Sequence, residues 1–418
     1  MFRPVRGMKD LYGIESSKYE YIRAKAMSVC SRYGYSEIST PMVEYSSVFQ
    51  RAIGDDTDVV SKEMYTFVDR GGESITLRPE GTAGVIRAVV TESLIQTLPV
   101  RLMYCGEMFR YDRPQKGRFR QFRQFGCEHI GEKSPYVDAT VIAMAAEILN
   151  VIGIFGFEIL VNSLGDTETM EAYTKAIVKY FSRHEKSLSP DSQVRLAKNP
   201  LRILDSKDQG DREICSMAPI ITDYFTKEAG SYFCKVCELL SAYGLNYEIN
   251  NFLVRGLDYY THTAFEFKST AGQFMESIGG GGRYDKLLNM FGGPDVSGVG
   301  FAFGIERLML LLDDERFNVS RRTVAVIPVS DEENDSAFSL FRLLHSNGIS
   351  AEFIHYGNMG KKMKTASKLK CELALIIGEE EKASDTVTIK FMNTTEPEQK
   401  SRSISSNDVA QFVKNILS

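Results

Sequence analysis

The sequence predicts a protein of the α/β class with two domains: an α+β domain interrupted by helices, and a smaller α/β domain after it. Three observations support this prediction. Strand-like runs at 101–111 and 118–130 flank a six-residue loop with Pro and Gly, as in a long antiparallel hairpin. Helical patterns dominate 167–244, between two strand-rich regions. From 324 onward strands alternate with helices, which is typical of a mainly parallel sheet.

The first elements are a helix and an interrupted strand. Residues 17–35 carry apolar side chains at helical spacing, and this pattern ends at Gly34. Residues 36–49 form a strand pattern that Pro41 interrupts, which suits the edge of a sheet or an interface. Together the helix and the strand predict a dimerisation surface.

The second strand of the predicted hairpin carries a cationic face. Residues of equal parity project to one side of a strand, and here they are Arg118, Arg120, Phe122, Gln124 and Glu128. Guanidinium groups bind phosphates and an aromatic ring stacks on a base, so this face could hold a nucleotide together with a polar substrate. Arg110, at the end of the first strand, could join it. The alternative is a solvated outer face with alternating charges.

Two Gly-rich segments could approach a ligand. Glu80 and Thr82 lie in a turn ahead of a helix, where Thr82 could instead be a simple N-cap. The four glycines of 279–282 remove side chains at a strand-to-helix junction, which allows either a close approach of the backbone to a ligand or a tight turn.

Two further arginines lie where they could contact a bound ligand. Arg307 lies in the first turn of a helix after Gly304, where a cation can reach a bound anion, although such an Arg is often an ordinary surface residue. Arg255 lies beside a Gly and two tyrosines on a strand pattern, and it could instead form an ion pair with Asp258.

Composition limits the class of protein. At 418 residues the chain is longer than one hydrophobic core usually organises, so more than one domain is expected. Its net charge of -5 argues against a protein that coats nucleic acid non-specifically. No apolar run approaches the roughly 20 residues that span a bilayer, and the N-terminal segment lacks the apolar core of a signal peptide. Seven scattered cysteines indicate a reducing compartment, and no nucleophile triad is evident. We therefore expect a cytoplasmic protein without a membrane segment, in which Cys234 and Cys237 pack in a core rather than bind zinc.

Taken together, these segments resemble class II aminoacyl-tRNA synthetases, and within that class the histidyl-tRNA synthetase family. The Pro41 strand with its helix is similar to motif 1, FRYDRPQKGRFRQF to motif 2 and GVGFAFGIERL to motif 3. LVRGLDYYTHTAFEF and GGGGRYD resemble the two histidine-specific motifs, and LRPEGTA resembles the turn that holds the amino acid. His262 departs from the family pattern, in which a smaller or differently polar residue is common.

The resemblance implies a domain layout and a reaction. It implies a class II catalytic domain with an antiparallel sheet over 1–320, a helical insertion at 167–245, and a C-terminal anticodon-binding domain over 323–418. The reaction would join L-histidine to ATP, accompanied by Mg²⁺, with release of pyrophosphate. The histidyl group would then be transferred to the 3′ end of tRNA(His). The protein would be a homodimer.

The resemblance also implies a role for each candidate residue. Arg110 and Arg255 would be catalytic, because they would hold the α-phosphate as it reorganises. The ATP site would comprise Arg110, Arg118, Phe122 and Arg307. The histidine site would comprise Glu80, Thr82, Gln124, Glu128, Arg255, Tyr259 and Tyr260. The loop residues expected to meet the acceptor end of tRNA are Arg113, Gln115 and Lys116. No protein motif for a metal is present.

Two other functions stay open. A regulatory subunit of ATP phosphoribosyltransferase would share the catalytic fold and bind histidine as a signal, but it would lack ATP-binding arginines and usually the C-terminal domain. An RNA-binding module without chemistry would leave Glu80, Glu128 and the tyrosine pair without a purpose. The basic stretch 360–370 is either an anticodon contact or a solvated helix face.

Overall fold

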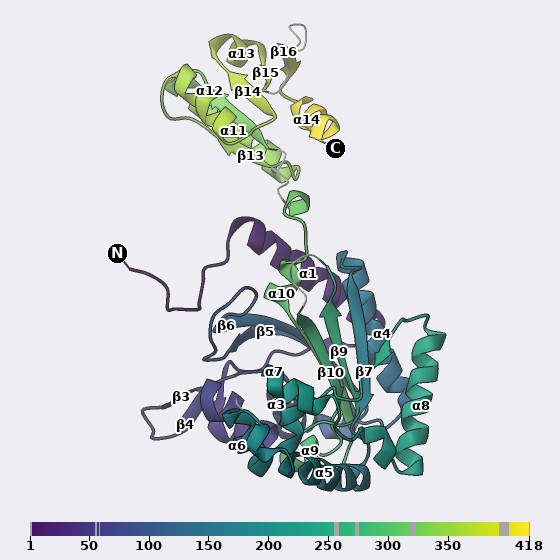
Figure 1. Ribbon diagram of the computed structural model, residues 1–418. Coiled ribbons are helices and arrows are strands. Elements are labelled where there is room, and N and C mark those ends of the chain that lie inside the picture. The colour runs from purple at the N-terminus through teal and green to yellow at the C-terminus, as the bar shows by residue number, and fades with distance from the viewer. Residues whose placement is uncertain are drawn as a thin grey trace. The chain divides into compact units, whose positions relative to one another are not determined.

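The computed structural model describes residues 2–54, 57, 59–254, 259–271, 276–317, 323–392 and 401–417. The chain divides into two compact units, Met1–Phe317 and Asn318–Ser418. Figure 1 traces the first unit from purple to green and the second from green to yellow. Each unit has its own hydrophobic core.

The first unit is built on a sheet that has eight strands within the described residues, in the order β1-β5-β6-β11-β10-β9-β7-β8. Neighbours from β5 to β7 pair antiparallel, whereas the short edge strands β1 and β8 pair parallel. The predicted antiparallel sheet is therefore confirmed. The strands are β1 (Ser36–Glu37), β5 (Val100–Phe109), β6 (Gln121–Ile130), β7 (Phe157–Ser163), β8 (Glu248–Ile249), β9 (Thr261–Ser269), β10 (Ser277–Arg283) and β11 (Gly298–Gly304).

Helices cover both faces of this sheet. On one face, α1 (Gly13–Arg32), α4 (Pro135–Ile152), α8 (Lys227–Ala242) and α10 (Ile305–Met309) share a core with Phe125 and Cys127 of β6. On the other face, α2 (Ser46–Ile53), α3 (Thr82–Thr91) and α9 (Leu287–Met290) pack around Tyr104 and Tyr284. The even-numbered residues of β6 face this second side, as the parity argument predicts.

Helix α4 is the one described helix long and apolar enough, by length and composition, to cross a membrane. Two thirds of it is buried inside the protein (67%). This burial is typical of a core helix.

The prediction of one strand pattern over 36–49 is wrong for the second half of this segment. Strand β1 stays with the large sheet, but β2 (Val43–Tyr45) joins β4 (Ser74–Leu77) and β3 (Tyr65–Val68) in a small separate sheet. The chain then forms α2, because its buried Val48, Phe49, Ala52 and Ile53 fall on one side of a helix.

The hairpin is confirmed, but its loop is longer than six residues. Strand β5 ends at Phe109 and β6 begins at Gln121, so Arg118 and Arg120 lie in the loop rather than on the strand. The Arg120 N–H donates to the Gly7 carbonyl oxygen at 2.8 Å. The Arg120 N–H is thus bonded to the N-terminal segment and is not available to pair with the first strand of the hairpin.

The region 167–244 is helical, as predicted, and no strand occurs in the described residues between β7 and β8. Helix α8 packs in the main core, whereas the preceding elements form a core of their own. These elements are α5 (Thr167–Ser182), α6 (Pro190–Lys198), the short helical turn η4 (Pro200–Asp205) and α7 (Gln209–Cys215).

The second unit contains a five-stranded sheet, counted over the described residues, in the order β13-β12-β14-β15-β16. Among the described strands, β12 pairs parallel with β13 and with β14, whereas β14 with β15 and β15 with β16 pair antiparallel, so the sheet is mixed rather than mainly parallel. Strand β16 and helix α13 were not predicted, because their short polar sequences carry no clear period. The elements are β12 (Val324–Pro328), α11 (Asn334–Ser346), β13 (Ala351–Phe353), α12 (Met359–Lys368), β14 (Leu373–Ile377), α13 (Glu379–Ser384), β15 (Thr386–Phe391), β16 (Ser401–Ser405) and α14 (Val409–Leu417).

Candidate active site

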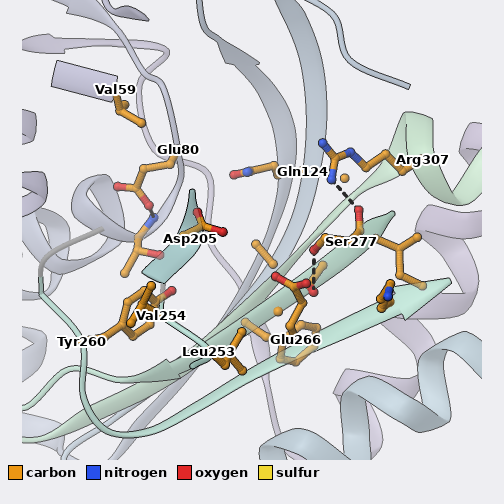
Figure 2. Close-up of a pocket in the computed structure, with 18 of the residues that line it drawn as sticks. Val59, Glu80, Gln124, Asp205, Leu253, Val254, Tyr260, Glu266, Ser277 and Arg307 are labelled. Atoms are coloured by element: carbon orange, nitrogen blue, oxygen red, sulfur yellow. Dashed lines mark hydrogen bonds between the residues drawn. The ribbon is translucent and has the colours of Figure 1, made fainter. Parts of the chain in front are cut away.

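A cavity of about 780 Å³ opens on the second face of the large sheet (Figure 2). Its walls come from β6, β9, β10 and β11, the start of α3, the loop 110–120 and the helical insertion. The predicted site residues that line it are Glu80, Thr82, Arg110, Arg118, Phe122, Gln124, Glu128, Tyr259, Tyr260 and Arg307. Residues far apart in the sequence thus meet at one place.

Some predicted residues are not part of this lining. Arg113, Gln115 and Lys116 are exposed in the loop and do not line the cavity. Arg255 lies outside the described residues, and so does its predicted alternative partner, Asp258.

Glu128 is the buried carboxyl at one end of the cavity. The Thr82 hydroxyl donates to Glu128 Oε1 at 2.7 Å, and the Tyr284 hydroxyl donates to Oε2. Burial raises the pKa of Glu128 to about 8, although these two hydrogen bonds act in the opposite direction. A Cβ on Gly300 of β11 would overlap Glu128 Oε2, so the strand needs glycine there. The carboxyl is therefore fixed in place and binds a proton near neutral pH.

Glu80 caps helix α3. It accepts hydrogen bonds from the backbone N–H groups of Thr82 and Ala83, each at 2.7 Å. Burial raises the pKa of Glu80, and these backbone bonds partly oppose the shift. The N-cap alternative for Thr82 is wrong, since Gly81 occupies that position and the Thr82 hydroxyl binds Glu128 instead.

Three guanidinium groups gather at the other end of the cavity. Arg110 Nε donates to the Pro79 carbonyl oxygen at 2.8 Å, and Arg118 Nη1 donates to Asp112 Oδ2 at 3.0 Å. Arg307 donates to the Ser277 carbonyl oxygen. Burial lowers the pKa of Arg307, and the positive charges of Arg118 and Arg110 lower it further. This mutual effect indicates that the three cations share one region, which suits a polyanion.

An aromatic ring and an amide lie between the two ends. The Arg110 guanidinium carbon is 5.5 Å from the centre of the Phe122 ring. Gln124 Oε1 is buried without a hydrogen-bond partner among the described residues. An unpaired buried acceptor destabilises the protein unless a ligand supplies a donor, so Gln124 fits a binding residue. The solvated-face alternative is wrong for Phe122, Gln124 and Glu128, because all three line the cavity.

Three expectations about this region need correction. Arg120 is not in the cavity lining: its guanidinium carbon is 3.7 Å from the Tyr111 ring centre, and its Nε donates to the Asp112 carbonyl oxygen. Tyr259 and Tyr260 precede β9 rather than lie on it. The four glycines lie inside β10 and not at a strand-to-helix junction. Glycine is needed there for strand packing, since a Cβ on Gly281 would overlap the Gly300 carbonyl oxygen of β11.

Several lining residues were missed by the sequence prediction. Glu266 and Ser277 lie on the strand floor, as Figure 2 shows. Alternation with the buried Phe265 and Phe267 could have indicated Glu266. Arg202, Leu204, Asp205 and Arg212 come from the insertion, and no local pattern indicates that they reach this cavity.

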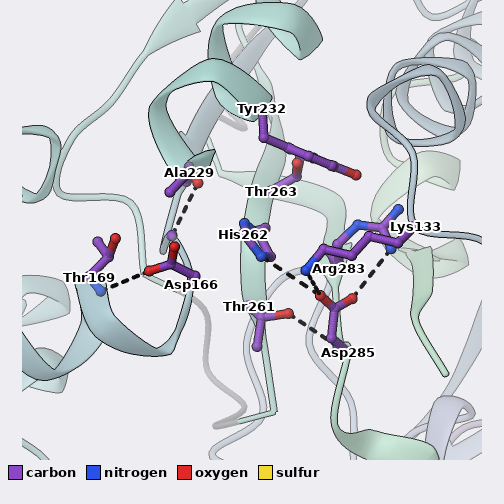
Figure 3. Close-up of polar contacts among 12 residues, drawn as sticks. Lys133, Asp166, Thr169, Ala229, Tyr232, Thr261, His262, Thr263, Arg283 and Asp285 are labelled. Atoms are coloured by element: carbon purple, nitrogen blue, oxygen red, sulfur yellow. Dashed lines mark hydrogen bonds and ion pairs between the residues drawn. The ribbon is translucent and has the colours of Figure 1, made fainter. Parts of the chain in front are cut away.

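A polar network lies at the start of β9 and the end of β10 (Figure 3). Arg283 Nε donates to both carboxylate oxygens of Asp138, at 3.1 and 3.2 Å, and neither side chain is exposed. Lys133 and His262 approach Asp285 at 3.1 and 3.8 Å. The network joins α4 to β9 and β10, and so supports the strand ends near the cavity.

No group of three or more His, Cys, Asp or Glu side chains that could hold a metal ion occurs in the described part of the chain. Glu266 lines the cavity near the cations and is an oxygen donor of the kind that Mg²⁺ prefers. The core prediction for the cysteine pair holds for Cys237, which packs on the main core, but not for the exposed Cys234.

Comparisons with known proteins agree with this geometry. A family model described as histidyl-tRNA synthetase matches residues 7–308. The chain belongs to the histidyl-tRNA synthetase family. A second model, described as anticodon binding domain, matches residues 323–416 of this family member.

The relatives cover nearly the whole chain. The histidine–tRNA ligase of Rhodospirillum rubrum is 44% identical over 98% of this chain and 99% of that protein. The histidine–tRNA ligase of Geobacillus kaustophilus is 43% identical over 94% and 95%. The crystal structure of apo S. aureus histidyl-tRNA synthetase superposes with a TM-score of 0.82 at 33% identity, covering 99% and 100%.

A more distant neighbour bears on the regulatory alternative. A Bacillus halodurans protein described as an ATP phosphoribosyltransferase regulatory subunit/histidyl-tRNA synthetase has a TM-score of 0.67 at 23% identity, covering 90% and 98%. This likeness supports the fold alone. Membership in the family makes the protein an aminoacyl-tRNA synthetase.

Proposed function

We propose that the protein is a histidine–tRNA ligase that activates L-histidine with ATP and transfers it to the 3′ end of tRNA(His). One observation carries the proposal: a single cavity has three guanidinium groups at one end and a buried carboxyl, Glu128, at the other. A polyanionic nucleotide and a small basic amino acid suit these two ends.

The phosphate end would bind ATP. Arg118 and Arg307 would hold the β- and γ-phosphates, Arg110 the α-phosphate, and Phe122 would stack on the adenine. Mg²⁺, bound with ATP, would neutralise phosphate charge. Arg255 would lie beside the substrate carboxylate and the α-phosphate.

The first step needs no protein nucleophile. A histidine carboxylate oxygen attacks the α-phosphorus of ATP, the bond to the bridging oxygen of the β-phosphate breaks, and pyrophosphate leaves. In the second step a ribose hydroxyl of the tRNA attacks the activated carbonyl, and AMP leaves. The side chains contribute orientation and charge stabilisation, which provide much of the rate enhancement in such reactions.

The other end would bind histidine. Glu80, Thr82 and Gln124 would surround the α-amino group, while Glu128 and Tyr260 would bind the two imidazole nitrogens and Tyr259 would pack behind them. Because Glu128 binds a proton near neutral pH, it can share one proton with the imidazole. Apolar amino acids would leave these buried polar groups unpaired, which is a strong basis for discrimination.

The partners of the protein would be tRNA and a second copy of the chain. Arg113, Gln115 and Lys116 would contact the tRNA acceptor end, and the second unit would bind the anticodon region. A homodimer formed through α1 and the segment around Pro41 would act in the cytoplasm, where its tRNA is used.

Histidine-dependent exchange of labelled pyrophosphate into ATP tests the proposal. The protein should catalyse exchange only with L-histidine present. Histidine binding without exchange would support the regulatory alternative, and tRNA binding without either would support the RNA-binding module. The three ATP-end arginines in one cavity and the presence of the second unit favour the ligase.

A further inference from the structure

The helical insertion forms part of the active-site wall. Leu204 and Asp205 of η4 and Arg212 of α7 line the cavity. In Figure 2, Asp205 is drawn on the side that carries Glu80 and Tyr260, away from Arg307. The insertion therefore borders the end of the cavity where the amino acid would bind.

Tyr260 connects the insertion to the catalytic core. It packs against the insertion core, as Leu204 does, and also against the core beneath α3. A displacement of η4 would therefore change the support of a side chain that faces the proposed imidazole site.

A buried carboxylate holds this part of the insertion together. Asp211 has no exposed surface, and it accepts four hydrogen bonds. The donors are the Ser189 N–H at 2.8 Å and the hydroxyl groups of Ser189, Ser192 and Ser206 at 2.7, 2.6 and 2.6 Å. Burial alone would raise the pKa of Asp211, but these bonds lower it to about 2, so the group stays ionised.

Three contacts hold turn η4 and the residue that follows it. Ser206, the residue after the turn, binds Asp211. The Cys215 thiol donates to the Ile203 carbonyl oxygen at 3.3 Å, and Arg195 Nη1 donates to the Arg202 carbonyl oxygen at 3.4 Å. Asp211 is the buried charge among these tethers, and a hydrogen bond to a charged group contributes more than a neutral one.

We propose that Asp211 is a positioning residue for histidine: it holds η4, so that the insertion core supports Tyr260 and Asp205 borders the amino-acid end of the cavity. The inference rests on the proposed function and deepens it. The insertion then determines amino-acid affinity before any tRNA binds. Arg110, Arg118 and Arg307, the arginines proposed to bind ATP, all lie outside the insertion, so ATP affinity should not depend on Asp211.

Exchange of pyrophosphate without tRNA tests this role in the full-length protein. Asp211→Asn should raise the KM for histidine about tenfold, with kcat and the KM for ATP within about twofold, because one end of the site loses its support. The matched control is Asp208→Asn, three positions earlier. Asp208 is exposed and caps α7 through the Asp211 N–H at 3.1 Å, a role that Asn fills equally well. This control should leave all three constants unchanged.

Ser206→Ala is a milder second variant, which removes one donor at the end of η4 and should raise the KM for histidine about threefold. Thermal unfolding of each variant tests for intact folding. An unchanged KM for histidine in folded Asp211→Asn, or in Ser206→Ala if Asp211→Asn does not fold, overturns the inference. Parallel changes in kcat and in both KM values would also overturn it. A wild-type protein without exchange would overturn the proposed function instead, so the two failures are distinguishable.

Discussion

Glu128 illustrates how burial changes the acidity of an ordinary carboxyl group. Its carboxyl lies on β6, is 1% exposed, and faces two hydroxyl donors. Desolvation penalises the charged form more than these donors stabilise it, so the pKa rises to about 8. Because Gly300 leaves space for Oε2, the neighbouring strand determines where the carboxyl lies.

Replacing Glu128 by Gln should weaken histidine binding. The amide keeps the shape but cannot share a proton with an imidazole, so we expect the KM for histidine to rise about 10- to 100-fold. The KM for ATP should change little, because the cations lie at the other end of the cavity. Steady-state exchange kinetics give both values, and an unaltered KM for histidine would place the imidazole elsewhere.

The raised pKa also predicts a pH dependence of stability. In the unfolded chain Glu128 titrates near its ordinary value of about 4.3, whereas in the folded protein it titrates near 8. Between these values the native state binds the extra proton, so this group stabilises the fold at low pH and that contribution disappears as pH rises toward 8. Urea unfolding at pH 6 and pH 8 should show a smaller pH effect in Glu128→Gln than in the wild type. Equal pH effects would contradict the assignment.

At the scale of elements, alternation along single strands was predictable and strand ends were not. The parity of Phe122, Gln124 and Glu128 places them on one face, as the structure has them. Regular pairing of the hairpin ends before Arg120, because the Arg120 N–H donates to the Gly7 carbonyl oxygen instead. Such a partner, distant in sequence, leaves no signal in the hairpin itself.

The loop 110–120 should contact RNA through its exposed cations. Replacing Arg113 and Lys116 together by Ala should raise the KM for tRNA about tenfold and make it less sensitive to salt, because fewer phosphate contacts release fewer counterions. Exchange without tRNA should be unaffected, since neither residue lines the cavity. Aminoacylation assays at two salt concentrations measure this effect, and an equal salt dependence in both proteins would argue against RNA contact.

At the scale of the whole molecule, the two units have separate cores. The core around Val326, Leu340 and Leu375 belongs to the second unit alone, and the cavity belongs to the first. Histidine activation should therefore depend on the first unit, whereas selection of the tRNA should require both.

A variant that ends at Phe317 tests this separation. It should retain histidine-dependent exchange within about threefold, while the KM for tRNA in aminoacylation should rise at least about tenfold through loss of the anticodon contact. Gel filtration and circular dichroism check that the shortened protein is folded. A folded variant without exchange would mean that the second unit supports the catalytic site.

The sequence by itself determined the fold class, the antiparallel hairpin, the helical insertion and the motifs that carry the family resemblance. These features depend on neighbouring residues, through alternation, helical spacing and turn composition. Only the tertiary structure decided that Tyr284 binds Glu128 and Gly300 leaves space for it, that Arg120 lies outside the cavity lining, and that η4 of the insertion lines the cavity. The physical reason is that these contacts join segments distant in the chain, and their geometry exists only after the sheet and the insertion have packed together.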